Sequence, residues 1–286
     1  MKSRLLYAAL GALALTTPVT AQTNPTVYGS VVFGHEWEDM EAPPYGLYSM
    51  PADNGNAIKL EVRNDAIKAN GGGVYVDGMY HLVDFTRYEF EQVVTFRTFD
   101  TKNNWKLINE QTIKSYSSAA SDLTYDPVGD KIYGCFKETA TSTQYFLGTL
   151  NPITGFASKI ADIDEELIVL ASTRDGKLYG VGAYGMLYSV DKQTGKLTKI
   201  GQTGKSVKYS QSATFDYASG RMLWAMTPHY TNESPELCEI DLSTGKTTTL
   251  ATIPERYEFT GIYTLSPYAV DNAPQTATAF GGKYEK

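Results

Sequence analysis

A basic residue followed closely by a tyrosine occurs three times in this sequence. A tyrosine ring beside a cation can stack on a sugar ring while the tyrosine hydroxyl forms a hydrogen bond with the sugar. The same pair can equally bind an acidic or aromatic group. The pairs therefore predict a binding site for a protein or carbohydrate partner. The alternative is that the tyrosines pack between units of the fold and the cations are only solvated. The pairs are Lys114 and Tyr116, Lys208 and Tyr209, and Arg256 and Tyr257.

Two polar residues, Asp122 and Ser212, occupy matching positions shortly after the first two of these pairs. Each stands at the start of an expected strand, and Thr260 falls close to the same position after the third pair. We expect these side chains to line the mouth of a central channel, where they would add to the binding site. Small polar residues also suit a narrow, water-filled channel for structural reasons alone.

Acidic side chains near the same segments raise the alternative of catalysis. Glycoside hydrolysis needs two facing carboxyl groups, about 5 Å apart for retention of configuration or about 6.5–9.5 Å apart for inversion. None of the candidates lies in a recognisable hydrolase motif, so we predict no catalytic residue. A five-bladed hydrolase or lyase that uses channel carboxylates is the enzymatic alternative. The candidates are Asp122, Asp164, Glu165, Glu166 and Glu258.

The sequence offers no recognisable site for a metal ion or cofactor. His35, His81 and His229 are not spaced as metal ligands, and we expect His81 to sit in a strand with one hydrogen bond. The acidic insertion at residues 35–45 has oxygen ligands for a cation such as Ca²⁺ but no EF-hand-like spacing. We predict neither a metal nor a cofactor, and a solvated loop at 35–45.

The elements that position these residues repeat along the chain. Residues 187–196 read LYSVDKQTGK, residues 237–246 read LCEIDLSTGK, and residues 146–155 are a looser copy. Their Thr-Gly turns, at 154–155, 194–195 and 244–245, lie 40 and 50 residues apart by subtraction. A repeat of this length that contains only short strands is typical of a β-propeller blade.

Five blades of four antiparallel strands can be counted. The first, at about 26–67, opens with a second-strand pattern and lacks an innermost strand. Residues 259–265 can supply that strand, and this closure would remove two open sheet edges that otherwise invite aggregation. We therefore predict an all-β, five-bladed propeller in which a C-terminal strand completes the first blade. Six blades, one of them degenerate, is the main alternative.

The repeat of residues 187–196 resembles that of the YncE-like and quinoprotein-like propeller superfamily, and the resemblance implies the fold alone. The chain also resembles the propeller portion of secreted proteins of Bacteroidota type, in which a segment like Asp-Asn-Ala-Pro at 271–274 leads into a fibronectin type III-like module. Quinone-dependent members of the superfamily have recurrent tryptophans. Only Trp37, Trp105 and Trp224 occur here, so no quinone is expected.

The chain begins like an exported protein. Lys2 and Arg4 precede an apolar run, and the small residues before Gln22 predict a signal peptide over residues 1–21. We expect the propeller at 22–266, a linker or tail at 267–286, and a secreted, periplasmic or cell-surface location. No later segment is long and apolar enough for a transmembrane span.

The net charge limits the kinds of partner that we expect, and the two cysteines bear on whether a disulfide forms. Without two signal-peptide cations, 23 basic residues face 32 acidic ones, a net charge of about −9 that argues against nucleic acid. Cys135 and Cys238 fall on blades that are not neighbours, so we expect no disulfide.

We predict a secreted, non-catalytic propeller that binds a protein or glycan through one face. A purely structural module of a larger surface protein is the further alternative.

Overall fold

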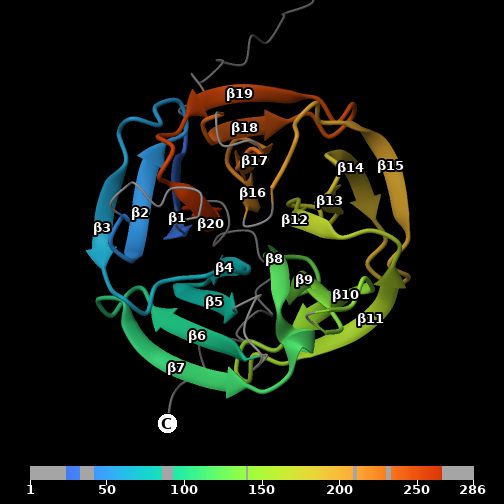
Figure 1. Cartoon of the computed structure of the whole chain (residues 1–286), viewed down its shortest axis with the longest axis horizontal. Helices are drawn as coiled ribbons and strands as arrows, with labels where there is room; N and C mark the ends of the chain where they lie inside the picture. The colour runs from blue at the N-terminus through green and yellow to red at the C-terminus, as the bar shows by residue number, and fades with distance from the viewer. Residues whose placement is uncertain are drawn as a thin grey trace, which may run out of the picture.

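The structure is a computed structural model that describes residues 24–32, 42–85, 93–139, 141–208, 211–229 and 233–265. The expected signal peptide and tail lie outside these residues, as do residue 209 and residues 35–41 of the insertion at 35–45. The described residues form five four-stranded antiparallel sheets. Figure 1 shows these sheets arranged around one axis, as the blades of a propeller.

The blades are numbered in chain order, and their strands run from the axis outwards. Blade 1 holds β20 (Glu258–Thr264), β1 (Thr26–Val32), β2 (Gly46–Pro51) and β3 (Lys59–Arg63). Blade 2 holds β4 (Gly73–Val76), β5 (Met79–Phe85), β6 (Val94–Asp100) and β7 (Lys106–Ile113). Blade 3 holds β8 (Ala120–Asp126), β9 (Lys131–Lys137), β10 (Tyr145–Leu150) and β11 (Ala157–Ile163).

The remaining blades repeat this order. Blade 4 holds β12 (Leu167–Ser172), β13 (Leu178–Gly182), β14 (Met186–Val190) and β15 (Leu197–Gln202). Blade 5 holds β16 (Ser212–Asp216), β17 (Arg221–Met226), β18 (Glu236–Ile240) and β19 (Thr247–Thr252). The predicted five-bladed propeller is therefore confirmed, and the part of the chain that the structure describes contains no sixth sheet.

The ring is closed by the strand that the sequence indicated. β20 pairs with β1 in antiparallel register, with Val27 opposite Thr264 and Val32 opposite Glu258. The first blade thus takes its innermost strand from the end of the described chain. Pairing removes the open backbone edge that either strand would otherwise present.

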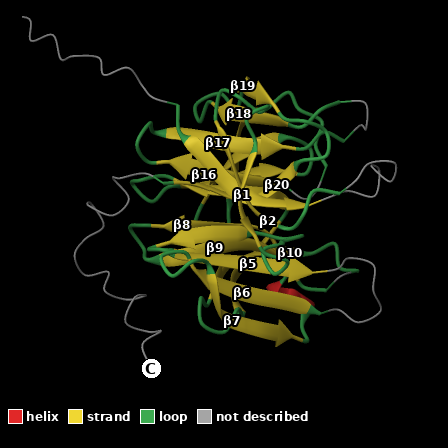
Figure 2. Ribbon diagram, turned by 90° about the vertical axis from the view of Figure 1, so that its left-hand side faces the viewer, coloured by secondary structure: helices red, strands yellow, loops and turns green. Residues whose placement is uncertain are grey.

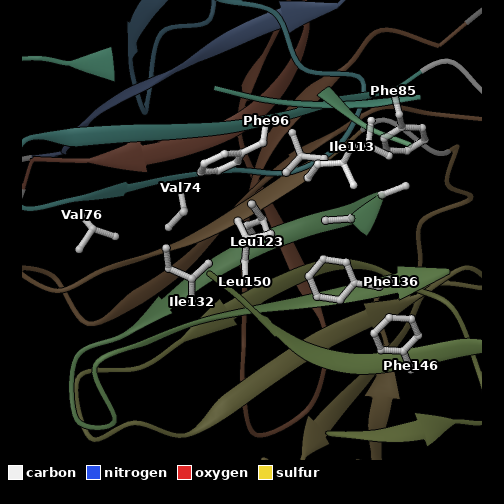
Figure 3. Close-up of a cluster of buried hydrophobic side chains, with 14 residues drawn as sticks. Val74, Val76, Phe85, Phe96, Ile113, Leu123, Ile132, Phe136, Phe146 and Leu150 are labelled. Atoms are coloured by element: carbon white, nitrogen blue, oxygen red, sulfur yellow. The ribbon is translucent and has the colours of Figure 1, made fainter. Parts of the chain in front are cut away.

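The core lies between neighbouring blades. Figure 3 shows the cluster between blades 2 and 3, where Val74 and Phe96 of blade 2 lie close to Leu123, Ile132 and Phe136 of blade 3. Alternate residues of each strand supply these apolar side chains. Burying each one contributes roughly 1.5–3 kcal/mol, so the stack of blades is held mainly by apolar burial.

The recurring Thr-Gly turns have a packing role. In blade 4, the Asp191 carboxylate accepts hydrogen bonds from the backbone N–H groups of Gln193 and Thr194, which sets the turn. Gly195 follows at φ +70°, and a Cβ there would lie 2.9 Å from Ala161 on the outer strand of blade 3. A Cβ at Gly245 would likewise be too close to the backbone of Gly201 in blade 4. The turn therefore recurs because the outer hairpin of a blade packs closely against the preceding blade at this glycine.

The propeller has two different faces, visible side on in Figure 2. The hairpin face carries the turns that join the third to the fourth strand of each blade and, in blades 2–5, the first to the second strand. The junction face carries the connections from one blade to the next, including the 3₁₀ helix η2 (Tyr116–Ser118), drawn red in Figure 2. Lys114, Lys208, Arg256 and Tyr257, from the basic-aromatic pairs of the sequence, lie in these connections.

Two smaller predictions are also confirmed. Cys135 lies in blade 3 and Cys238 in blade 5, and both are free and buried. His81 lies in β5 with a single hydrogen bond, between its Nδ1 and the Thr98 hydroxyl at 2.9 Å, while its Nε2 has no partner.

Candidate functional site

Three of the junction-face residues predicted from sequence, Lys208, Arg256 and Tyr257, contact other side chains of the protein. The Lys208 ammonium lies 3.3 Å from the carboxylate of Glu258, whose side chain is 3% exposed. Arg256 lies over the ring of Tyr257, which packs edge-on against Tyr48 with 5.7 Å between ring centres. Lys114 is exposed in the β7–β8 connection. Tyr209 lies outside the described residues, and so does the side chain of Tyr116. A ligand-binding role for this set stays a prediction.

Asp122 and Ser212 are fully buried, not exposed at a channel mouth. One oxygen of Asp122 accepts hydrogen bonds from the backbone N–H groups of Leu170 and Ala213, each at 3.0 Å. The Ser212 hydroxyl donates to the other oxygen at 2.9 Å and accepts from the N–H of Ile262 at 3.0 Å. These contacts link the inner strands of blades 1, 3, 4 and 5, and they match the structural alternative.

Burial changes the acid–base behaviour of this central carboxyl group. Removal from water raises the pKa of Asp122 to about 8, against the lowering effect of its hydrogen bonds to Ala213, Leu170 and Ser212. The group is thus held in a site that favours its protonated form. A substrate on the surface cannot reach it, because its exposed fraction is 0%.

The other candidate carboxylates hold the junction face together. Glu166 accepts from the hydroxyls of Tyr145 at 2.9 Å and Ser121 at 3.3 Å, and Glu165 accepts from the hydroxyl of Tyr188. Asp164 is exposed. Among the described residues, no group of three or more His, Cys, Asp and Glu side chains is placed to hold a metal ion.

A well-formed pocket opens on the opposite, hairpin face. It has a volume of about 430 Å³ and is lined by the ends of β4, β8, β16 and β20, the innermost strands of four blades. It therefore lies at the axis, and its wall is formed largely by aliphatic and aromatic side chains. Members of this wall are Val74, Leu123, Ala213, Phe215, Ile262 and Tyr263. We call it the channel pocket.

Stacked tyrosines form one side of the channel pocket. The rings of Tyr75 and Tyr263 lie 4.7 Å apart and are nearly parallel at 9°. Tyr28 stacks on the other face of this arrangement, 5.4 Å from Tyr263. On the opposite side, Phe215 and Tyr217 lie 5.7 Å apart at a tilt of 56°. Such contacts hold each ring in place, so the pocket is formed before any ligand arrives.

Two of the tyrosine hydroxyls at the pocket, those of Tyr125 and Tyr217, donate to protein atoms. The hydroxyl of Tyr217 donates to the backbone carbonyl of Tyr125 at 3.2 Å, and that of Tyr125 donates to Asp130 at 3.0 Å. Burial raises the pKa of both hydroxyls, which therefore stay neutral at physiological pH. What the pocket offers to a ligand is thus mainly ring and aliphatic surface.

Two further pockets adjoin the channel pocket. The first lies between blades 1 and 2, has a volume of about 390 Å³, and shares Tyr75, Tyr263 and Leu265 with the channel pocket. The second lies between blades 4 and 5, has a volume of about 630 Å³, and shares Phe215 and Tyr217. Each aromatic pair is therefore a wall between two pockets on the same face.

Sequence reasoning missed this face. The signal was an aromatic residue at or near the end of four of the five inner strands, namely Tyr75, Tyr125, Phe215 and Tyr263. Because strand ends on one face of a propeller converge at the axis, these rings could have been expected to meet. The basic-aromatic pairs were more conspicuous because each is adjacent in sequence.

The chain was compared with known proteins. No family model matches it, and no curated protein matches it in sequence. A structure of an auxiliary nutrient binding protein from Bacteroides ovatus is similar, with 11% identity, a TM-score of 0.41, and coverage of 81% of this chain and 49% of that one. This chain thus spans about half the length of that protein. Among the described residues, no helix has the length and apolar character needed to span a bilayer.

Two further solved structures have a similar fold. One is a chain of the nidogen/laminin complex, with 12% identity, a TM-score of 0.46, and coverage of 83% of this chain and 97% of that one. The other is a gluconolactonase from Xanthomonas campestris, with 12% identity, a TM-score of 0.45, and coverage of 82% and 78%. Sequence identities this low indicate a similarity of fold alone, because proteins with unrelated functions share the propeller fold.

Proposed function

We propose that this protein is a secreted, non-catalytic binding module whose channel pocket receives an apolar group of a partner protein. One observation carries the proposal: the pocket presents ring and aliphatic surface, while the hydroxyls of Tyr125 and Tyr217 are bonded to protein atoms. A volume of about 430 Å³ lies within the range of pockets that hold small ligands, roughly 300–1,000 Å³.

The chemistry of the wall favours an apolar group over a sugar ring. Burying a hydroxyl without a hydrogen-bond partner costs about 1–3 kcal/mol in proteins, and a sugar carries several hydroxyls. A phenylalanine or leucine side chain would lose no hydrogen bond in the same space. Apolar side chains that fill a preformed pocket are also what dominates protein–protein affinity.

The rim of the pocket suits the backbone of such a partner. Asp77 and Lys102 supply one carboxylate and one ammonium at the edge, and Thr214 supplies a hydroxyl nearby. The hydroxyl of Thr264 donates to Asp216 at 2.9 Å and can only accept from a partner. Leu265, also at the edge, is 56% exposed. An apolar centre with a polar rim is the usual composition of a binding hot spot.

The proposal is tested by methyl NMR with small probes. The amides of N-acetyl phenylalanine, leucine and serine would be titrated against protein labelled at Val74, Leu123 and Ile262. The first two probes should shift these methyl signals at millimolar concentration, and the serine amide should not. A Thr214→Trp variant, which fills the pocket, should weaken the effect at least about tenfold.

The control is Tyr184→Ala, which removes an 83% exposed ring on the junction face and should change nothing. Thermal melting would establish that both variants stay folded. Absence of any shift at the pocket methyls contradicts the proposal. Shifts near Lys208 and Tyr257 instead would favour a binding site on the junction face. This is the second candidate site, and the observation in its favour is that Arg256 lies over the ring of Tyr257.

A further inference from the structure

Three pockets of the hairpin face follow one another and share wall residues, and we call this row of pockets the groove. It begins at the seam between blades 1 and 2, passes the axis at the channel pocket, and ends at the seam between blades 4 and 5. Its two internal partitions are the aromatic pairs Tyr75–Tyr263 and Phe215–Tyr217. A ligand that fills only the channel pocket would leave both flanking pockets empty.

The two ends of the groove differ in charge. At the blade 1–2 end, Glu61 is the one charged side chain among the described lining residues. At the blade 4–5 end, Arg174 and Lys177 accompany Asp175, and two cations with one carboxylate sum to +1. One end of the groove therefore presents the Glu61 carboxylate, which pairs with Lys59, and the other end carries a net positive charge, although Lys177 pairs with Asp175 at 2.8 Å. The apolar channel pocket lies between them.

The Glu61 carboxylate is partly accessible to a ligand, with 27% of its side chain exposed. Glu61 receives hydrogen bonds from the Lys59 ammonium at 2.7 Å and the Ser49 hydroxyl at 2.6 Å, which lower the pKa of the carboxyl group and keep it ionised. The Lys59 side chain is 70% exposed. An exposed pair of this kind contributes only about 0–1 kcal/mol, so a ligand cation can compete with Lys59.

We infer that the groove binds an extended segment of a partner protein, with an apolar residue in the channel pocket, a basic residue toward Glu61 and an acidic residue toward Arg174 and Lys177. This inference rests on the proposed function and adds the length, direction and charge pattern of the ligand. An extended chain has the necessary shape because successive side chains alternate in direction, so one enters the pocket while its neighbours reach the rim.

A phage-displayed library of random linear peptides would test the inference. Selected peptides should share an aromatic or large aliphatic residue with a basic residue on one side and an acidic residue on the other. Calorimetry with one such synthetic peptide should show about fivefold to tenfold weaker binding for Glu61→Gln. A Glu61→Lys variant should recover affinity when the basic residue of the peptide is replaced by glutamate.

The matched control is Glu138→Gln. Glu138 is also a surface carboxylate paired with a lysine, at 2.6 Å from Lys159, but it lies on the blade 3 edge away from the groove. Its replacement should leave peptide affinity unchanged. Equal losses for Glu61→Gln and Glu138→Gln would mean a nonspecific charge effect and would overturn the inference.

Other outcomes separate the inference from the proposed function. If the amide probes shift the pocket methyls but no peptide is enriched, the extended partner is wrong and the pocket proposal stands. If linear oligosaccharides on a glycan array bind and shift the Trp105 signal, the occupant is a glycan. If a Tyr268→Ser/Phe280→Ser variant alone shifts the pocket methyls, the occupant is the chain's own segment 266–286. Each of the three results overturns the inference.

Discussion

The carboxylate of Asp122 and the hydroxyl of Ser212 lie 2.9 Å apart, although they belong to blades 3 and 5 and blade 4 stands between them. The same two side chains also bind backbone N–H groups of Leu170 in blade 4 and Ile262 in blade 1. Two buried residues thus tie the inner strands of four blades to one another across the axis. The floor of the channel pocket is built on Leu123 and Ala213, their neighbours in sequence.

The first prediction concerns the stability supplied by Asp122. Asp122→Ala leaves the N–H groups of Leu170 and Ala213 without an acceptor, and each such buried group costs about 1–3 kcal/mol. We expect the free energy of unfolding to fall by about 3 kcal/mol or more. Asp122→Asn keeps one acceptor oxygen and can donate to Ser212, so its loss should be much smaller. Urea denaturation measures both, and equal losses would contradict this account.

The pH dependence of the same group has a definite sign. The folded pKa of Asp122 is raised to about 8 from an ordinary 3.8, so the folded protein holds this proton more tightly than the unfolded chain. Its contribution to stability is complete below about pH 4 and is lost as the pH rises toward 8. The stability of wild type relative to Asp122→Asn should therefore decline over this interval, and a pH-independent difference would refute the raised pKa.

The second prediction concerns His81, whose contribution to stability changes with pH in the opposite direction to that of Asp122. Burial lowers the pKa of His81 from 6.5 to about 3, so the unfolded chain binds the proton more tightly. The stability supplied by neutral His81 is present above about pH 6.5 and is lost as the pH falls toward 3. A His81→Leu/Thr98→Val variant removes both partners of the hydrogen bond. It should lose less stability than wild type between about pH 6.5 and 4, as measured by urea denaturation at each pH.

The third prediction separates two reasons for a glycine in a turn. Gly220 has φ +72° with nothing near a Cβ, and Gly245 has φ +80° with the Gly201 carbonyl oxygen 2.4 Å from a Cβ. Gly220→Ala should cost about 1–2 kcal/mol for the left-handed backbone alone. Gly245→Ala should cost clearly more, because the outer strand of blade 4 must move. Thermal and urea unfolding of the two variants would give the difference, and equal costs would mean that the seating of the turn contributes nothing.

The propeller could be predicted because its determinants are local and repeated. The turn at Asp191 and Gly195 and its copy at Asp241 and Gly245 each set a hairpin with their own residues, so a short window of sequence is enough to identify them. Closure was predictable for a different reason. A first blade without an innermost strand leaves a backbone edge that needs a partner, and residues 259–265 were the strand left over.

The site was not predictable to the same extent because its contacts are distant in sequence. Tyr75 and Tyr263 stack at 4.7 Å, yet neither stands beside the other in any sequence window. Which end of the channel is open to a ligand also depends on contacts across the axis, such as that between Asp122 and Ser212. The pairs Lys208–Tyr209 and Arg256–Tyr257 indicated the junction face because they are adjacent in the chain, and their binding role stays a prediction.

The closure of blade 1 determines the order in which the protein can be completed during synthesis. β1 leaves the ribosome first and β20 last, so β1 lacks its inner neighbour while the intervening strands emerge. Bringing together ends so far apart in the chain is slow compared with forming local hairpins. Until then, the free edge of β1 can also accept β20 from another chain. Crowded synthesis should therefore favour exchanged dimers, in which each ring is closed by the other molecule's last strand.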